Sequence, residues 1–222
     1  MVISGSSRAP RLAAFLAVLA TAAQAAGLMP WGVSPAAAAW TRTITMNIVG
    51  DGDGTLTSDD GEILCLAAGG AQSGDCVETY VVPDFIDHID LVLTWDPATG
   101  SYVCVTFGDC YPGGATQTRT ITISRDGGDV TLTSAFNLKT YTVLADAFPD
   151  GNGQVLGNGS PCTVPAGYDF CQRFRHGDGV TLRAEPGQGG IFTGWRVEPC
   201  LGQGATCTFT AASDVRVTAT FN

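Results

Sequence analysis

The sequence contains a single lysine, Lys139, and only 14% of its residues are charged. Its formal net charge is −10. Binding to nucleic acid requires clustered Lys and Arg side chains near the phosphates, so this charge balance excludes a nucleic acid as the partner. The excess of acidic residues is typical of a soluble exported protein and does not by itself identify a cationic partner.

The sequence also lacks the short motifs of common enzymes. It contains no Gly-x-Ser-x-Gly, His-Glu-x-x-His, phosphate-loop or Cys-x-x-Cys motif. The two histidines, His88 and His176, have no nucleophile or acid beside them in a recognisable pattern. Asp84 and Asp87 are paired acids that a glycosidase could use, so a small secreted hydrolase stays an alternative. We predict no catalytic residue, no cofactor site and no metal site, and therefore a protein that is not an enzyme.

No long apolar run interrupts the chain beyond a short one near its start. The run Leu12–Ala20 follows Arg8 and Arg11 and is well short of the ~20 residues that a spanning helix needs. A basic segment, a short apolar run and small residues after it are typical of a signal peptide. Cleavage after Ala25 or after Ala39 fits this pattern, and we assign residues 1–39 to the signal peptide.

No cysteine precedes Cys65, so the region around the cleavage sites has no residue for lipid attachment. We therefore predict an exported protein located in the extracellular space, on the cell surface or in the periplasm. We expect no stable membrane insertion after the signal peptide is removed.

The residues that are abundant favour strands and turns. The sequence has 29 Gly and 11 Pro, and 45% of its residues are hydrophobic. This composition excludes a wholly disordered chain and favours a turn-rich β-protein. The predicted fold class is all-β.

The same series of strand patterns, glycine-rich turns and cysteine pairs occurs twice along the chain. Thr43–Val49 alternates apolar and polar residues, which predicts a half-buried strand. The glycine-rich turn Gly50–Gly54 and the segment Thr55–Thr57 follow, and we expect a hairpin. The same order returns later in the chain, which indicates an internal duplication. The later landmarks are a strand Thr142–Phe148, a turn Pro149–Gly153, a cysteine loop Cys162–Cys171, a strand Val180–Pro186 and a last strand Val215–Asn222.

We therefore divide the mature chain into two small tandem modules, residues 40–138 and 139–222. The linker, Leu138-Lys139, is hardly longer than a turn, so the modules are expected to form a tightly joined pair.

Three segments of the second module form one pattern: Val180–Pro186, Phe192–Trp195 and Val217–Phe221. Through these segments the module resembles the divergent internalin B-type repeat of bacterial surface and secreted proteins. It implies a small all-β module that is used in tandem on exported proteins, and it implies no catalytic activity.

The first module departs from this pattern at three positions. Val105 replaces the tryptophan of Phe-x-Gly-Trp, Gln117 stands where the second module has Cys207, and Cys104 stands where it has Gly194. We interpret the last two differences as one disulfide bond that has moved.

All eight cysteines lie in the mature chain. An even number in an exported protein indicates disulfide bonds, and eight cysteines allow 105 pairings. Only nine pairings remain if every bond stays inside one module, and we predict the local ones. The predicted disulfide bonds are Cys65–Cys76, Cys104–Cys110, Cys162–Cys171 and Cys200–Cys207.

Asp51–Glu62 superficially resembles a calcium-binding loop, because oxygen-bearing residues occupy most ligand positions. However, Leu56 occupies the position that needs glycine for a sharp turn. Turn chemistry is the preferred interpretation, and a calcium-dependent adhesive module is an alternative.

Acidic residues are concentrated in the first module. Residues 40–139 carry fourteen acids and four bases, whereas residues 140–222 carry seven acids and five bases. The only basic cluster is Arg173-Phe174-Arg175-His176. A solvated surface explains this cluster, and a head-to-tail contact with an acidic first module is the alternative.

Three aromatic residues stand in strand patterns: Trp95, Phe192 and Trp195. We predict that they lie in the core, with an exposed platform for sugars or a protein partner as the alternative. The predicted function is that of a structural or interaction protein of the cell surface or secreted fraction. Its partner would be an unidentified protein or glycan, and a carbohydrate-binding accessory module is a further alternative.

Overall fold

The computed structural model describes residues 38–105, 108–149, 152–162 and 170–222. These ranges form strands, turns and bends, so the all-β prediction is confirmed for them. Within them no helix has the length and apolar character of a membrane span. The predicted signal-peptide run, Leu12–Ala20, and the cleavage site at Ala25 lie outside the described residues.

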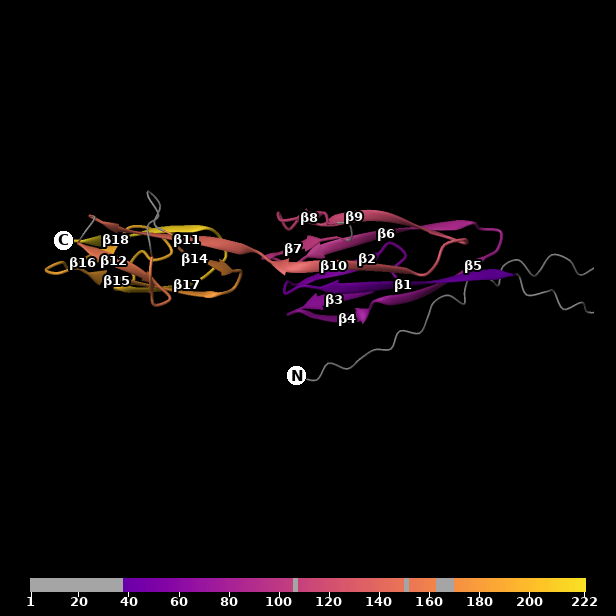
Figure 1. Ribbon diagram of the computed structural model, residues 1–222, viewed down its shortest axis with the longest axis horizontal. Helices are drawn as coiled ribbons and strands as arrows, with labels where there is room; N and C mark the ends of the chain where they lie inside the picture. The colour runs from indigo at the N-terminus through magenta and orange to yellow at the C-terminus, as the bar shows by residue number, and fades with distance from the viewer. Residues whose placement is uncertain (1–37, 106–107, 150–151, 163–169) are drawn as a thin grey trace, which may run out of the picture. The chain divides into compact units, whose positions relative to one another are not determined.

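The first half of the described chain contains ten strands (Figure 1). They are β1 (Ala39–Val49), β2 (Gly54–Ser58), β3 (Leu64–Ala68), β4 (Ala71–Asp75), β5 (Val77–Pro83), β6 (His88–Pro97), β7 (Ser101–Cys104), β8 (Cys110–Tyr111), β9 (Gln117–Ser124) and β10 (Val130–Leu138).

The second half contains a further eight strands in its described ranges. They are β11 (Thr140–Phe148), β12 (Gly153–Gly157), β13 (Ser160–Pro161), β14 (Phe170–Arg175), β15 (Gly179–Pro186), β16 (Phe192–Trp195), β17 (Thr206–Thr210) and β18 (Val215–Phe221).

Each half consists of two sheets, and the strand orders of the two halves correspond. The first half has the orders β5-β1-β10-β7-β8 and β4-β3-β2-β6-β9. The second half has the orders β14-β11-β18-β16 and β13-β12-β15-β17. In each half the first strand pairs in parallel with the last strand, β1 with β10 and β11 with β18, and the other pairs are antiparallel. The first half differs by the additional short strands β4 and β8.

The core of the first half lies between its two sheets. On β1, Ile44 and Met46 are buried while the alternate residues point outward. On β6, Leu93 and Trp95 are buried in the same way and belong to the same cluster. Period-2 burial from both sheets is the pattern of a β-sandwich.

The second half has a core of its own. Val143, Leu182, Trp195, Val217 and Phe221 are all buried in one cluster that contains no residue of the first half. Each half therefore has a separate core.

The predicted hairpin at Gly50–Gly54 is wrong. β1 pairs with β5 and β10, whereas β2 pairs with β3 and β6, so the glycine-rich turn carries the chain from one sheet to the other. The turn crosses close to β10: a Cβ on Gly52 would lie 2.6 Å from the carbonyl carbon of Asn137. β11 and β12 also lie in different sheets. Glycine-rich turns serve hairpins and sheet crossings equally, so the local sequence does not distinguish them.

One residue separates the two halves. β10 ends at Leu138 and β11 begins at Thr140, which leaves Lys139 between them. The Lys139 N–H donates to the carbonyl oxygen of Gly100 at 2.8 Å, and the Lys139 carbonyl accepts the N–H of His176 at 2.8 Å. The linking residue therefore forms backbone hydrogen bonds with both halves.

Candidate functional site

The structure brings together three of the four predicted cysteine pairs. The Cα–Cα distances are 4.8 Å for Cys65–Cys76, 4.0 Å for Cys104–Cys110 and 5.3 Å for Cys200–Cys207. Cys162 is also disulfide-bonded, but the side chain of its predicted partner, Cys171, lies outside the described residues.

The three described bonds occupy different places in the two halves. Cys65–Cys76 and Cys200–Cys207 are buried, so each is part of a core. Cys104–Cys110 instead joins β7 to β8 in a position that is partly exposed. Gln117, which stands where the second module has Cys207, begins β9 opposite Trp95. All three bonds join segments close in sequence and leave no free thiol among the described cysteines.

The acids of Asp51–Glu62 do not converge on one point. Asp51 and Asp53 precede β2 and Asp60 follows it. Five strand residues separate their ends by roughly 13 Å, at about 3.3 Å per residue. One calcium ion needs oxygens at about 2.3–2.6 Å, so the twelve residues cannot act as one loop. The calcium-loop alternative is therefore wrong for this geometry.

These acids instead accept hydrogen bonds from the protein. Asp51 accepts the N–H of Leu138 and pairs with Arg175 at 2.5 Å. The bond from the Leu138 N–H is the main reason that the pKa of Asp51 is lowered, and Arg175 lowers it further.

Asp60 is held by a small polar network. Burial raises its pKa, but hydrogen bonds from Ser58, Tyr80 and the Glu62 N–H outweigh burial, and the pKa is lowered overall. Burial and the Asp60 carboxylate together raise the pKa of Tyr80. The network fixes the β2–β3 turn against β5.

The other predicted polar residues are separated in space or occupied. Asp87 forms an ion pair with Arg125 at 3.2 Å. His88 is exposed on the first strand position of β6, while the ring of His176 lies 6.0 Å from that of Tyr141. The Tyr141 hydroxyl lies 3.5 Å from Nδ1 of His176, and no serine or cysteine contacts either histidine among their described contacts.

The core prediction for the aromatic residues is confirmed for the two tryptophans. Trp95 is 2% exposed and Trp195 is 4% exposed. Phe192 is half-buried and packs edge-on against Trp195 and Phe221, with ring centroids 5.6 and 5.9 Å away. An exposed aromatic platform built from these residues is therefore wrong.

Arginines gather on the outward face of the sheet β14-β11-β18-β16. Phe174 is buried, so its neighbours Arg173 and Arg175 point outward from β14. Val217 is buried, so Arg216 points outward from β18. Arg196 follows the buried Trp195, and its N–H donates to Thr218 of β18. We call Arg173, Arg175, Arg196 and Arg216 the arginine face.

Several contacts orient these side chains. Arg216 donates from Nε and Nη2 to the Asp146 carboxylate, at 3.0 and 2.7 Å. The guanidinium of Arg196 lies over the exposed ring of Phe148, 4.5 Å from its centroid. Arg173 is exposed. Planar guanidinium groups held on one face suit carboxylate or phosphate partners.

Sequence reasoning found Arg173 and Arg175 and missed the other two members of the arginine face. Arg196 and Arg216 are more than twenty residues away in the chain, and strand pairing brings them to the same face. The sequence pattern could have revealed both residues. Arg196 directly follows the buried Trp195, and Arg216 directly precedes the buried Val217.

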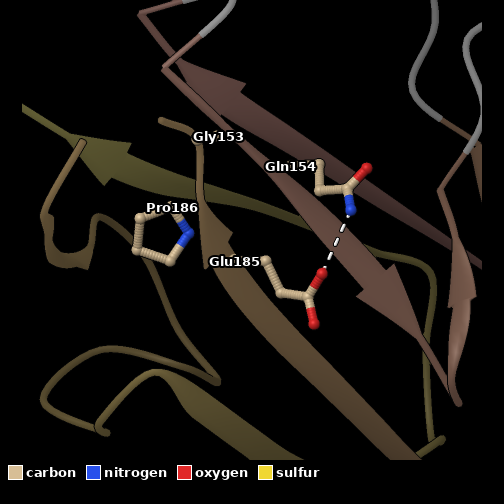
Figure 2. Close-up of a pocket in the computed structure, with 5 residues that line it drawn as sticks. Gly153, Gln154, Glu185 and Pro186 are labelled. Atoms are coloured by element: carbon tan, nitrogen blue, oxygen red, sulfur yellow. Dashed lines mark hydrogen bonds between the residues drawn. The ribbon is translucent and has the colours of Figure 1, made fainter. Parts of the chain in front are cut away.

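An open hollow of about 250 Å³ lies on the other sheet of the second half, lined by Gly153, Gln154, Glu185, Pro186 and Gly187. Figure 2 shows the Gln154 side chain reaching across to Glu185, whose carboxylate accepts its amide N–H at 3.1 Å. The lining of this hollow includes one carboxylate, that of Glu185, whereas glycoside hydrolysis requires two.

A second open hollow, of about 370 Å³, includes Glu198, Asp214 and Arg216 in its lining. The Asp214 carboxylate there accepts the Thr142 N–H at 2.7 Å. It thereby fixes the start of β11 against β18.

Comparison with known families identifies one match, which is confined to the second half. The divergent InlB B-repeat domain matches residues 143–222. This range contains β12 to β18 and all but the start of β11. No curated protein matches the chain.

Solved structures resemble the chain only at a coarse level. The Bacillus anthracis TIE protein aligns over 82% of this chain and 33% of its own length, with 9% identity and a TM-score of 0.40. The chain thus spans about a third of that protein. The major pilin T-13 of Streptococcus pyogenes aligns over 82% of this chain and 96% of its own, with 9% identity and a TM-score of 0.32.

Proposed function

We propose that this chain, whose residues 143–222 match the divergent InlB B-repeat domain, is an exported structural or interaction protein of the bacterial cell surface or secreted fraction. The observation that carries the proposal is a pair of β-halves, each with its own core and its own local disulfide bonds. Disulfide bonds persist in oxidising compartments outside the cytoplasm, which supports export.

The proposal includes a duplication, in which residues 40–138 are a diverged copy of residues 139–222. The corresponding strand orders support it. So does a shared detail: Asp129 accepts the N–H of Thr43, and Asp214 accepts the N–H of Thr142, at the same register of the first and last strands. Residues 1–39 would be the signal peptide.

A non-catalytic role is the second part of the proposal. The lining of the hollow at Glu185 has one carboxylate. The second hollow has Glu198 and Asp214 in its lining, and Asp214 already accepts a backbone N–H. The arginine face offers a surface for contact, and its charge favours an acidic protein or glycan as the partner. A glycoside hydrolase would need a cleft with two unoccupied carboxylates.

Export and disulfide formation can be tested together. The tagged full chain would be expressed in a bacterium, and cell fractions would be treated with a thiol-reactive polymer before and after reduction. We expect the protein outside the cytoplasm, labelled only after reduction, with an amino terminus that identifies cleavage after Ala25 or Ala39. A cytoplasmic protein that is labelled without reduction would contradict the proposal.

The contact role can be tested by sedimentation with isolated cell envelopes. We expect the Arg173→Gln/Arg196→Gln variant to bind less than the unmodified chain, by about tenfold, and salt to weaken binding. Arg183→Gln is the matched control, because Arg183 is exposed on the opposite sheet. Equal binding by all three proteins would exclude the arginine face as the contact surface.

A further inference from the structure

The outward strand positions of β5, β1 and β10 carry no charged side chain, and Asp129, the residue before β10, lies at the edge of this face, where it accepts the N–H of Thr43. On β1, the buried Ile44 and Met46 alternate with outward residues, and the same alternation holds on β5 and β10. The outward positions pair across the strands, with Thr43 opposite Thr79 and Thr45 opposite Thr131. We call this surface the threonine face and define it by Thr43, Thr45, Thr79, Val81, Thr131 and Thr133.

The threonine face is built from small side chains in register. The hydroxyl groups of Thr43 and Thr79 lie 3.1 Å apart and share a hydrogen bond. Valines extend the face: Val77 is 52% exposed, Val81 is 68% exposed and Val49 is 45% exposed. No charged side chain stands among these strand positions, and Asp129 lies at their edge.

Other acids of the same half lie on its second sheet. On the outward side of the other sheet, Asp90 and Asp96 alternate with buried residues of β6 and accept hydrogen bonds from Thr122 and Thr116. The outward strand positions shown are therefore charged on one sheet of the half and neutral on β5, β1 and β10 of the other.

The equivalent face of the second half has the opposite character. Strand register places Arg173 at the position of Thr79 and Arg175 at the position of Val81. It also places Arg216 at the position of Thr131. The same face is thus neutral in one half and cationic in the other, which indicates two different contacts.

We propose that the threonine face binds the threonine face of a second copy, in a two-fold symmetric dimer. Two copies of a chain with a net charge of −10 repel each other, and most contacts would bring carboxylates together. Contact through the threonine face brings no charged strand residue into the interface and leaves Asp129 at its edge, while its hydroxyl and methyl groups can pair with their symmetry mates.

The size of the face limits the area that the dimer can bury. β1 extends about 26 Å from Thr41 to Val49, and the neighbouring strands give a width of about 19 Å with side chains. The contact would bury roughly 1,000 Å² in total, at the lower limit for a specific interface. The dimer is therefore weak in solution and gains strength where copies are concentrated on a surface.

Sedimentation of residues 38–222, the compact unit that contains every described strand, tests the proposal. From about 1 μM to about 1 mM, the mass should rise from one chain towards two. Raising the salt from about 50 mM to about 500 mM should strengthen the dimer severalfold, because salt screens repulsion between the acidic copies. An ionic contact between the arginine face of one copy and acids of another would weaken instead.

Two single variants, each with one added carboxylate, compare the threonine face with the other sheet. Thr131→Glu places a charge in the threonine face, and we expect at least a tenfold loss of dimer affinity. Thr120→Glu adds the same charge to an exposed position of β9, on the other sheet, and should leave dimerisation within about twofold. Unchanged thermal unfolding would show that both variants fold.

A measurement on the unmodified protein provides an independent readout. Amide chemical shifts that change with protein concentration should be confined to β1, β5 and β10. A chain that remains monomeric at about 1 mM, a dimer that weakens in salt, or equal effects of both substitutions would each overturn the proposal.

Discussion

Trp95 donates its indole N–H to the hydroxyl oxygen of Ser134 over 2.8 Å, and both side chains are buried. Trp95 belongs to β6 and Ser134 to β10, so this hydrogen bond joins the two sheets of the first half across its core. In the second half the indole N–H of Trp195 donates to the carbonyl oxygen of Gly204, also at 2.8 Å. Each half thus satisfies a buried indole, but with a different kind of partner.

Ser134→Ala should destabilise the first half by about 1–3 kcal/mol, because it leaves a buried indole N–H without an acceptor. Chemical denaturation measures the change. Ser73→Ala, at an exposed position of β4, is the control and should have little effect. The double variant Trp95→Phe/Ser134→Ala removes the donor as well, so its cost should be less than the sum of the single costs. Additive costs would show that the hydrogen bond contributes nothing.

Gly153→Ala should destabilise the second half by about 1–3 kcal/mol through overpacking. An added Cβ at Gly153 would lie 2.6 Å from an atom of the Phe221 ring. Gly179→Ala is the matched control, because a Cβ at Gly179 would have no atom within 4 Å. Thermal unfolding compares the two, and Phe221→Leu should relieve part of the cost in the Gly153→Ala background. If the two alanine variants melt alike, the close packing of Gly153 against the ring is refuted.

Removal of the Cys65–Cys76 bond should cost more stability than removal of Cys104–Cys110. The sequence separations are 11 and 6 residues, for which loop-closure entropy gives about 3 and about 2 kcal/mol. Cys65 and Cys76 are also buried, so replacing both with alanine leaves a cavity. Urea denaturation of the two double-alanine variants measures the difference, and the reverse order would contradict the assignment of Cys65–Cys76 to the core.

Stability should fall as the pH drops below about 4, in part through Asp60. Its pKa in the folded protein is lowered from the usual 3.8 by the hydrogen bonds that outweigh burial. The unfolded chain therefore binds its proton first, so the stabilisation is present above the unfolded pKa and is lost as the pH falls through the folded pKa. Asp60→Asn should destabilise the protein at neutral pH and lose less stability on acidification.

Urea denaturation at about pH 7 and about pH 3 tests this prediction, since the two conditions lie on either side of the unfolded pKa. Asp126→Asn, in the exposed turn between β9 and β10, controls for the loss of one negative charge. A pH dependence that is identical in both variants would rule out the Asp60 network as its source.

Much of the local structure follows from the sequence, because it depends on neighbouring residues. Alternating apolar residues in Val180–Pro186 predict β15, and the same pattern predicts β18. Short cysteine spacings predict the bond Cys200–Cys207, because close cysteines meet easily across one turn. The resemblance of the second half was also readable, since its motifs are short and contiguous.

Only the tertiary structure decided which strands pair and which side chains share a face. The turn Gly50–Gly54 carries a hairpin signal but connects two sheets, since the pairing of β1 with β10 is made over more than eighty residues of chain. Ser134 became the partner of Trp95, and Arg216 joined Arg173, for the same reason. The alternation of apolar and polar residues is set within one segment. Strand pairing depends instead on which distant segments form backbone hydrogen bonds with each other.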